Sequence, residues 1–502
     1  MSSPPVASPA DPPARLGRQR RYSFGRLAVA EALFGFAIVT ALCGLGGLFD
    51  DASEALALLA TAGVTGAIGW KGRRIYERRP RPAPGRVVSG LAAAWMALVA
   101  AGTVVYLLTG ITSQVDDAMF ESAAGFSTTA LSTLDIEEFS TTMHIWRAST
   151  QWLGGLLGVI AAVVSLPSAI RGSVHVPKGQ GRRLDRLAPT PIVGRRRVLG
   201  VYSALTLVCG LGYLVTGLGS RDSVVHALTT VSTGGFSSRT DSLASAGTGS
   251  QVVATVFMII AGTSYFALWW AIRRHGRRFV ESTELRLYLT ILVAATVAMM
   301  TTVDGISPGD ATFAVASAVS TTGYAISDWT VLSPGALSIL LVLVATGSMG
   351  GSAGGGLRVA RVRTLVVFAN RELRRQLDPN SVSVVKADNR PIDDRELERL
   401  TGYQIAHFSL VSVGAFLLAA AGVDVITAIW TAVSVISTAG PAPGTGPFGD
   451  ASALGADGRL VLIPGMLAGR LTILPLLLGI VSVIRAKDAM LRRVKRFARS
   501  ER

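Results

Sequence analysis

Long apolar stretches recur along the chain, and they constrain its fold more than any other feature. About 20 predominantly apolar residues in a helix cross the hydrocarbon core of a bilayer. Half of the 502 residues are hydrophobic and only 16% are charged, a composition outside the usual range of soluble domains. The sequence therefore predicts a polytopic membrane protein. Its predicted spans lie at roughly 27–49, 54–70, 87–110, 143–167, 198–218, 250–272, 284–302, 333–369, 403–422 and 459–484.

Basic residues orient these spans. The net charge of +16 would by itself also suit a nucleic-acid-binding protein. However, the basic residues gather in every second connection and in the C-terminal tail, at 71–86, 171–197, 273–286, 370–400 and from Arg485. This is the positive-inside pattern of membrane proteins. We therefore expect both termini to be cytoplasmic, a disordered tail at 1–26, contact with membrane lipid and no nucleic-acid partner.

Residues that carry enzyme or metal chemistry are sparse. Cys43 and Cys209 lie in apolar runs and form no CxxC motif, and the five histidines have no metal-ligand spacing. No nucleophile–base set or large soluble domain is recognisable. The sequence predicts that the protein is not an enzyme and carries no cofactor on this chain.

The remaining connections are acidic or mixed. Segment 111–145 contains Asp and Glu, segment 303–332 contains Asp, and neither segment contains Lys or Arg. Each acid alone is compatible with an ordinary solvated loop. As a set they would give the outer face a negative potential, which raises the local concentration of cations.

A four-residue motif recurs in these outer segments. The copies are STTA at 127–130, STGG at 232–235, STTG at 320–323 and STAG at 437–440. Each ends an apolar stretch too short to cross the bilayer, at 116–128, 222–233, 309–322 and 424–438, and stretches of 10–14 residues suit re-entrant segments. The chain thus repeats a helix, a half-helix, a polar loop and a helix four times, with spans 27–70 outside the repeat.

Four such loops could meet around a pseudo-fourfold axis. Irregular backbone at membrane depth is tolerated where it is buried in protein or lines a water-filled path. A ring of backbone carbonyls there can replace the hydration shell of a monovalent cation, and the negative C-terminal ends of the half-helices would favour it. The alternative is that Ser, Thr and Gly simply form tight turns.

The same residues resemble a known family. The runs GFSTTALST, HALTTVSTGGFSSRT, SAVSTTGYAISD and STAGPAPGTG resemble the four pore loops of the Trk/Ktr/HKT superfamily of potassium transporters, and the bacterial TrkH-type subunit is the most similar type. WRASTQWLGGLLG (146–158), TGSMGGSAGGGLRVARVR (346–363), LDPNSVSVVKADNRPI (377–392) and MLAGRLTILP (466–475) resemble further family segments. The resemblance covers about residues 27–490.

The resemblance implies a fold and a function. The fold is an all-α polytopic membrane protein with four helix–pore-loop–helix repeats around a central pore, plus an N-terminal helix pair. The implied function is channel-like potassium uptake across the bacterial cytoplasmic membrane, driven by the membrane potential. The implied organisation is a tail (1–26), the helix pair (27–70), pore repeats at 87–170, 198–272, 284–369 and 401–484, a cytoplasmic loop (370–400) and a basic tail (485–502). The family's selectivity-filter positions, whose carbonyls would bind K⁺, fall on Thr129, Ala130, Gly234, Gly235, Thr322, Gly323, Ala439 and Gly440.

The first filter position departs from the bacterial pattern. It is usually Gly in bacterial members of the family, and here it is Ala130. A non-glycine residue held in left-handed geometry is destabilised by roughly 1–2 kcal/mol. One hypothesis is that Ala130 weakens discrimination for K⁺ over Na⁺ and yields a sodium-permeable transporter. The alternative is that the loop accommodates the methyl group with modest strain.

The stretch SMGGSAGGG (348–356) interrupts an apolar span. Glycines at this density disfavour a continuous helix, and the absence of Lys-Ser/Thr after the last Gly excludes a Walker phosphate loop. A close-packing helix face is one alternative. The resemblance favours an intramembrane gate loop that plugs the pore below the filter. Its residues would be Gly350, Gly351, Ser352, Gly354, Gly355 and Gly356.

Arg470 lies inside the apolar run LVLIPGMLAGRLTILP. A charge within the membrane is expensive to place and is therefore a candidate functional group. The resemblance implies that Arg470 faces the pore beneath the filter and limits cation leak. The alternative is a structural ion pair or a side chain that reaches an interface. The family's usual acidic partner after GRL is missing, so we expect Arg470 to bind another acceptor.

The resemblance also implies partners. TrkH-type subunits form homodimers and sit on a TrkA-like ring of cytoplasmic nucleotide-binding proteins, and this chain has no dinucleotide-binding fingerprint of its own. Two other functional classes stay open. One is a symporter that couples potassium to H⁺ or Na⁺, and the other is a membrane receptor or enzyme that transports nothing.

Overall fold

The computed structural model describes residues 21–77, 84–165, 191–273, 281–378, 386–387, 390–391, 394–445 and 447–471. The predicted basic tail at 485–502 lies outside these residues, as do most of the tail at 1–26, most of the connection at 171–197 and part of the loop at 370–400. The described chain is helical apart from two pairs of two-residue strands. β1 (Arg21–Tyr22) pairs in parallel with β2 (Tyr76–Glu77), and β3 (Lys386–Ala387) pairs antiparallel with β4 (Arg390–Pro391).

The helices follow the predicted order. The N-terminal pair is α1 (Phe24–Gly47) and α2 (Ala52–Ile75). The first two repeats contain α3 (Pro84–Leu108), α4 (Val115–Ser127), α5 (Thr141–Ile160) and the π-helix η1 (Ala161–Ser165), then α7 (Pro191–Val215), α8 (Ser220–Val231), α9 (Gly247–Ala261) and α10 (Tyr265–Ile272). The last two contain α12 (Thr283–Thr302), α13 (Pro308–Ser320), η3 (Trp329–Val331), α14 (Pro334–Thr346) and α15 (Val359–Leu377), then α16 (Asp394–Ala420), α17 (Val425–Ile436), η4 (Pro447–Gly449) and α18 (Ala456–Leu471).

Several of these helices can cross a bilayer. Among the described residues, six are long and apolar enough to span, and a seventh span results if the bent pair α9–α10 counts as one. The predicted short apolar stretches are the short helices α4, α8, α13 and α17, which we call the half-helices. The polytopic all-α architecture expected from the hydropathy pattern is confirmed.

Two predicted spans are broken. The span 333–369 consists of α14 and α15 with an irregular segment between them, as its glycines predicted. The predicted span at 250–272 is sharply bent, because α9 and α10 meet at an angle of 102°. The backbone groups freed at this break bind the irregular segment, since the N–H groups of Met349 and Ala353 donate to the carbonyls of Gly262 and Ala261 at 3.1 and 3.3 Å. Neighbouring backbone thus replaces the missing helical hydrogen bonds.

Short polar motifs decide where the half-helices begin. Ser307 accepts a side-chain hydrogen bond from the N–H of Asp310, and Pro308 occupies the first helical position of α13. Asp424 accepts hydrogen bonds from the N–H groups of Ile426 and Thr427 at the start of α17. These side chains satisfy N–H groups that a helix start leaves without partners.

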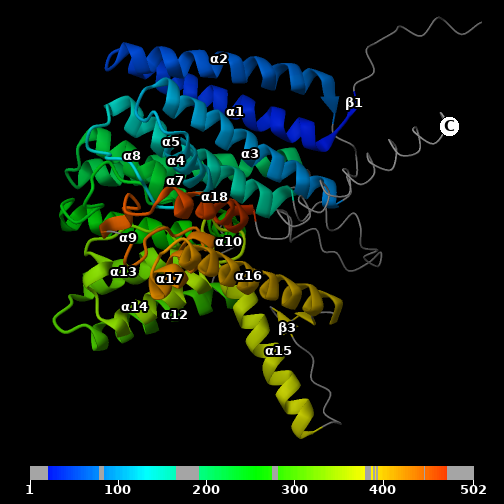
Figure 1. The fold of residues 1–502 in the computed structure, drawn as a ribbon. Helices are drawn as coiled ribbons and strands as arrows, with labels where there is room; N and C mark the ends of the chain where they lie inside the picture. The colour runs from blue at the N-terminus through cyan, green and yellow to red at the C-terminus, as the bar shows by residue number, and fades with distance from the viewer. Residues whose placement is uncertain are drawn as a thin grey trace, which may run out of the picture.

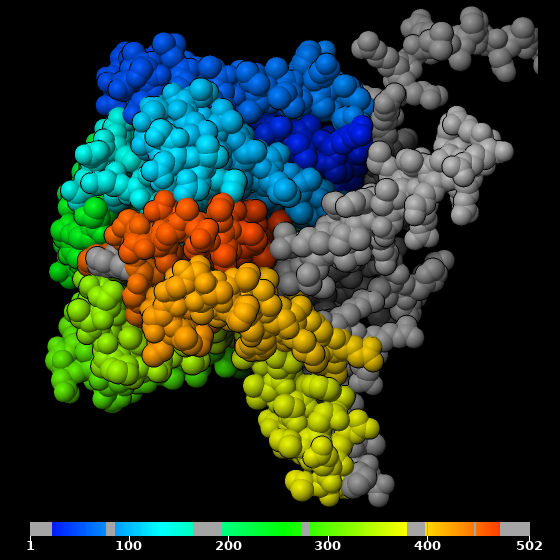
Figure 2. Space-filling model, viewed as in Figure 1, coloured from blue at the N-terminus to red at the C-terminus, as the bar shows by residue number. Residues whose placement is uncertain are grey.

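The buried apolar residues form two clusters rather than one. One cluster unites the second and third repeats, and the other unites α1–α2, the first repeat and the fourth repeat. The α1–α2 pair packs on the outer side of α3, and α15 projects from the helical body as a separate arm (Figure 1). The space-filling view shows α17 and α18 between the first and third repeats (Figure 2). This order places the ends of the four half-helices in the middle of the molecule.

Candidate functional site

The four half-helices end with the same backbone geometry. We call the segments 127–130, 232–235, 320–323 and 437–440, which contain the predicted filter positions, filter loops 1 to 4. Their second residue is always a threonine with positive φ, at 58°, 53°, 57° and 58° for Thr128, Thr233, Thr321 and Thr438. Their third N–H always donates to the carbonyl five residues earlier, over 2.8–3.0 Å: Thr129 to Ala124, Gly234 to Thr229, Thr322 to Ser317 and Ala439 to Ser434.

This geometry is the Schellman motif, in which glycine normally occupies the left-handed position. A β-branched residue there is a genuine outlier, and each such strained residue is destabilised by about 1–3 kcal/mol. Strain of this kind persists only where the surrounding structure enforces it, and it clusters at functional sites. Its recurrence at four equivalent threonines argues against four unrelated turns.

The fourth residues differ between the loops. Gly235, Gly323 and Gly440 have positive φ values of 75°, 82° and 108°, a region that glycine enters freely. Ala130 is absent from the described residues with positive φ, so the expectation that it is held in left-handed geometry is wrong. Loop 1 takes another path because the Ala130 N–H donates to the carbonyl of Ala439, at 3.2 Å.

The four loops form a closed ring. A Cβ built on Gly235 of loop 2 would lie 1.9 Å from the carbonyl oxygen of Thr322 in loop 3. One built on Gly323 would lie 2.2 Å from the carbonyl oxygen of Ala439 in loop 4. Loop 4 in turn contacts loop 1 through Ala130. Each loop therefore borders the next, and the structure brings the third and fourth residues of the four loops close together.

Ala130 points its methyl group into this ring. A Cβ built on Gly235 or on Gly323 would lie 2.7 Å from the Cβ of Ala130. Gly235 belongs to the neighbouring loop, whereas Gly323 belongs to the loop on the opposite side of the ring. A methyl group within reach of both lies near the centre, where the other three loops have no side chain.

Two buried polar groups support the ring from behind. The fully buried Gln151 of α5 donates from Nε2 to the carbonyl of Gly234 at 2.7 Å, and its Oε1 accepts from the N–H of Phe236 at 3.0 Å. Glu121 of α4 is also fully buried and forms a 3.2 Å ion pair with Arg147 of α5. Sequence reasoning placed Glu121 among the acids of the outer loops and overlooked Gln151.

Glu121 and Arg147 link loops 1 and 2. Glu121 Oε1 accepts hydrogen bonds from the Ser132 hydroxyl and from the N–H of Thr133, at 2.5 and 2.8 Å. The Arg147 guanidinium donates to the carbonyl of Ser237 at 3.3 Å, and its Cζ lies 3.5 Å from the centroid of the Phe236 ring. The ion pair therefore holds the segments that follow both loops.

The glycine-rich segment 347–358 contains the predicted gate loop, and we use that name for it. It lies directly against the inner side of the ring. The Gly355 N–H donates to the hydroxyl of Thr321 at 2.7 Å, and a Cβ on Gly355 would lie 2.0 Å from the carbonyl oxygen of Ser437. A Cβ on Gly354 would likewise lie 2.4 Å from the carbonyl oxygen of Ser320. Only glycine fits at these two contacts, which explains Gly354 and Gly355.

Several groups hold the gate loop in place. Glu284 of α12 accepts from the Gly350 N–H at 2.6 Å. Arg358, at the end of the loop, donates to the carbonyl of Met349 at 3.1 Å and to the hydroxyl of Ser352 at 3.0 Å. Arg358 has φ of 79° although it is not a glycine. Sequence reasoning missed both charged residues, since Glu284 binds a backbone group 66 positions away and Arg358 is one of several arginines in its segment.

Arg470 binds the gate loop as well. Its Nη1 donates to the carbonyl of Ala353 at 2.6 Å, and its Nη2 donates to the carbonyl of Gly154 at 3.3 Å. Its Nε has no hydrogen-bond partner among the residues that the structure describes, and the side chain is buried. The expectation of another acceptor is confirmed, and that acceptor is backbone carbonyl rather than carboxylate.

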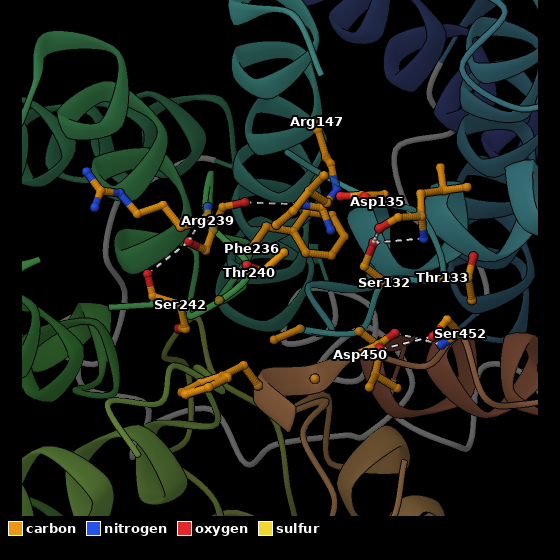
Figure 3. A pocket seen from close by; sticks show the side chains of 18 residues that line it. Ser132, Thr133, Asp135, Arg147, Phe236, Arg239, Thr240, Ser242, Asp450 and Ser452 are labelled. Atoms are coloured by element: carbon orange, nitrogen blue, oxygen red, sulfur yellow. Dashed lines mark hydrogen bonds between the residues drawn. The ribbon is translucent and has the colours of Figure 1, made fainter. Parts of the chain in front are cut away.

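A cavity of about 350 Å³ opens on the outer side of the ring. Ala130, Gly235 and Gly449 form part of its lining, together with the Arg147–Phe236 stack, and Asp135 and Asp450 lie at its wall (Figure 3). The cavity therefore joins the outside of the protein to the fourth residues of filter loops 1 and 2. Its lining holds both acidic and basic side chains.

Several outer acids are paired rather than free. Asp117 is hydrogen-bonded to Arg459, and Asp222 forms ion pairs with Arg221 and Arg239, at 3.0 and 3.1 Å. Burial opposes ionisation of Asp222, but hydrogen bonds from Ser238 and the two arginines outweigh it and hold the pKa of this carboxyl below its usual range. The outer face is thus less negative than its acids alone suggest.

Comparisons with known proteins agree with this arrangement. The profile of the family described as "TrkH: Cation transport protein" matches residues 81–489. The Trk system potassium uptake protein TrkH of Halomonas elongata is 30% identical over 440 residues, which cover 83% of this chain and 89% of that protein. TrkH of Escherichia coli is 29% identical over 394 residues, which cover 72% of this chain and 78% of that protein. The crystal structure of the potassium transporter TrkH from Vibrio parahaemolyticus superposes with a TM-score of 0.81 at 22% identity, covering 90% of this chain and 98% of that one.

Proposed function

The chain belongs to the TrkH family of cation transport proteins, which are transporters rather than enzymes, and we propose that it takes up potassium through a pore on the axis of the four filter loops. The observation that carries this proposal is the closed ring of four equivalent loops, open to a cavity outside and covered by the gate loop inside. K⁺ is the transported ion, and the membrane potential drives its entry by about 2.3 kcal/mol per charge per 100 mV.

The proposed ion-binding groups are the carbonyls of the third and fourth residue of each loop. These residues are Thr129, Ala130, Gly234, Gly235, Thr322, Gly323, Ala439 and Gly440. Carbonyl oxygens in a ring replace the water shell of a monovalent cation. The half-helices end at the ring, and the negative ends of their dipoles favour a cation there.

A sodium-permeable or poorly selective transporter is the second candidate function. The observation that favours it is the position of the Ala130 methyl group near the centre of the ring. A methyl group can neither coordinate a cation nor leave the ring its full width. Coupling to H⁺ or Na⁺ is a further alternative, and flux that follows a pH gradient would support it.

We propose that the gate loop closes the pore in the position that the structure shows. The residues involved include Gly350, Gly351, Ser352 and the three glycines at 354–356. The contacts of this loop with Ser320, Thr321 and Ser437 leave it directly beneath the filter. Arg470 then acts in two ways, because it places a positive charge below the filter and binds the loop that closes it. Opening of the pore requires the gate loop to move and this hydrogen bond to break.

We also propose the location, orientation, domain boundaries and partners that the sequence predicts. The protein is an integral membrane protein, and we place it in the bacterial cytoplasmic membrane with both termini inside and the domain boundaries predicted above. The projecting helix α15 carries basic residues near its end, which suits contact with lipid headgroups or a cytoplasmic partner. A homodimer on a TrkA-like nucleotide-binding ring is the proposed assembly.

Ion flux in liposomes tests the function directly. Purified protein is reconstituted, and uptake driven by a gradient is measured with K⁺, Rb⁺, Na⁺ and Li⁺ in turn. Preference for K⁺ and Rb⁺ supports potassium uptake, whereas comparable Na⁺ flux supports the second candidate. Absence of flux with all four ions, in protein that remains folded and monodisperse, would contradict both.

A further inference from the structure

We propose that Gln151 is a positioning residue of the filter, which sets its ion preference by fixing the carbonyl of Gly234. The inference rests on the proposed filter and deepens it. Gln151 would touch no ion. It would act through the backbone of loop 2 and through the spacing between loops 1 and 2.

Both ends of the Gln151 amide bind filter backbone. Nε2 donates to the carbonyl of Gly234 at 2.7 Å and, more weakly, to the carbonyl of Thr129 at 3.5 Å. Oε1 accepts from the N–H of Phe236 at 3.0 Å. The network fixes which end is nitrogen, because one partner is an N–H donor and the others are carbonyl acceptors. Gln151 therefore clamps the residues on both sides of Gly235.

Helix α5 holds this side chain in place between the two loops. A Cβ built on Gly154 would lie 2.2 Å from the carbonyl oxygen of Phe126, at the end of α4. One built on Gly155 would lie 2.8 Å from the Cβ of Ser232, at the end of α8. The backbone of α5 thus rests against both half-helix ends, so Gln151 can serve both loops without moving.

Gln151 is distinctive among the groups that bind the third residues of the loops. The other hydrogen bonds to these carbonyls in the described chain come from backbone, with Leu131 N–H bound to Thr129 and Ala130 N–H bound to Ala439. A carbonyl oxygen has two lone pairs, so Gly234 can accept from Gln151 and still bind a cation. The hydrogen bond then fixes the direction of an ion ligand.

The same contact explains the motif of loop 2. STGG has glycine in its third position, whereas the other copies have Thr or Ala there. A Cβ built on Gly234 would lie 2.2 Å from Oε1 of Gln151, although Gly234 is not among the residues with positive φ. Gly234, the first glycine of STGG, is therefore required by the space that Gln151 occupies, and not by the backbone conformation.

Two variants from opposite sides of this contact test the proposal. Gln151→Leu keeps the volume and removes the hydrogen bonds, and Gly234→Ala pushes the amide away. In liposomes, we measure the ratio of K⁺ flux to Na⁺ flux. In thermal unfolding, we measure the K⁺ concentration that gives half-maximal protection of the protein against unfolding. We expect the K⁺ concentration to rise about fivefold in both variants, since a hydrogen bond of this kind contributes on the order of 1 kcal/mol. We also expect the flux ratio to fall.

Thr150→Val is the matched control. Thr150 is a buried neighbour on α5 whose hydroxyl binds the Arg147 carbonyl of its own helix, at 2.7 Å. The Thr150→Val variant should change the unfolding temperature without changing K⁺ protection or the flux ratio. Should Gln151→Leu aggregate, Gln151→Asn carries the same expectation with a side chain one methylene shorter.

The outcomes separate the inference from the proposed function. A wild type that neither transports K⁺ nor is protected by it would overturn the proposed function. If the wild type has both properties, and the Gln151 and Gly234 variants match it in K⁺ protection and flux ratio, only the positioning role of Gln151 is overturned.

Discussion

The guanidinium of Arg470 on α18 donates a 2.6 Å hydrogen bond to the carbonyl of Ala353 in the gate loop. The two residues are 117 positions apart, and the bond joins the third repeat to the fourth beneath the filter. In the proposed closed state, Arg470 therefore both places a positive charge beneath the filter and holds the gate loop through a hydrogen bond. Substitutions that keep one property and remove the other can tell them apart.

We expect Arg470→Gln to raise K⁺ flux about tenfold or more, because hydrogen bonds to charged groups contribute ~1.5–3 kcal/mol and this bond stabilises the closed loop. Arg470→Lys keeps the charge but loses the forked geometry of the guanidinium, so it should give an intermediate flux. Liposome uptake of Rb⁺ measures both. If Arg470→Lys behaved as wild type, the positive charge alone would limit the cation leak. The hydrogen bond to Ala353 would then have no role in holding the gate loop closed.

Gly355 gives a second test of the gate. A Cβ at Gly355 would lie 2.0 Å from the Ser437 carbonyl oxygen and 2.4 Å from the Thr438 hydroxyl. Gly355→Ala should therefore push the gate loop from the filter and raise basal flux several-fold. Gly350→Ala is the matched control, since its nearest contact would be Glu284 at 3.5 Å. Equal flux in the two variants would argue that the loop does not close the pore.

Ala130→Gly tests the asymmetry of the filter. Removal of the methyl group frees the centre of the ring and lets loop 1 adopt the positive φ of Gly235 and Gly323. We expect the K⁺/Na⁺ flux ratio to rise about tenfold, which corresponds to ~1.4 kcal/mol. The measurement is bi-ionic flux in liposomes with wild type beside the variant. Unchanged selectivity would mean that the ring already accommodates Ala130.

Much of the fold could be predicted from the sequence, because hydropathy and motif repetition are local signals. The half-helices end at four copies of one motif, and the glycines at 354–356 mark the gate loop. The break between α9 and α10 was missed, since its freed backbone groups find partners in the gate loop some ninety residues later. No local rule reports such long-range compensation.

The details of the site were harder to predict for the same reason. Gln151 directly follows Ser149 and Thr150, and no periodic pattern distinguishes it from these other polar residues. The backbone of Ala130 was predicted wrongly because its conformation depends on a hydrogen bond to Ala439 in another repeat. The resemblance supplied the filter positions, whereas the groups that hold them depend on packing between repeats.

The buried pair of Glu121 and Arg147 should stabilise the outer end of the pore. Glu121→Ala leaves Arg147 buried and without its carboxylate, and loss of one partner of a buried pair destabilises by about 3–5 kcal/mol. We expect a marked fall in the unfolding temperature of the detergent-purified protein. Asp116→Asn is the control, because the Asp116 side chain is 25% exposed and pairs with Arg459 at 3.6 Å, so its effect should stay within ~1 kcal/mol. Equal shifts for the two variants would show that the buried pair contributes no more than a surface one.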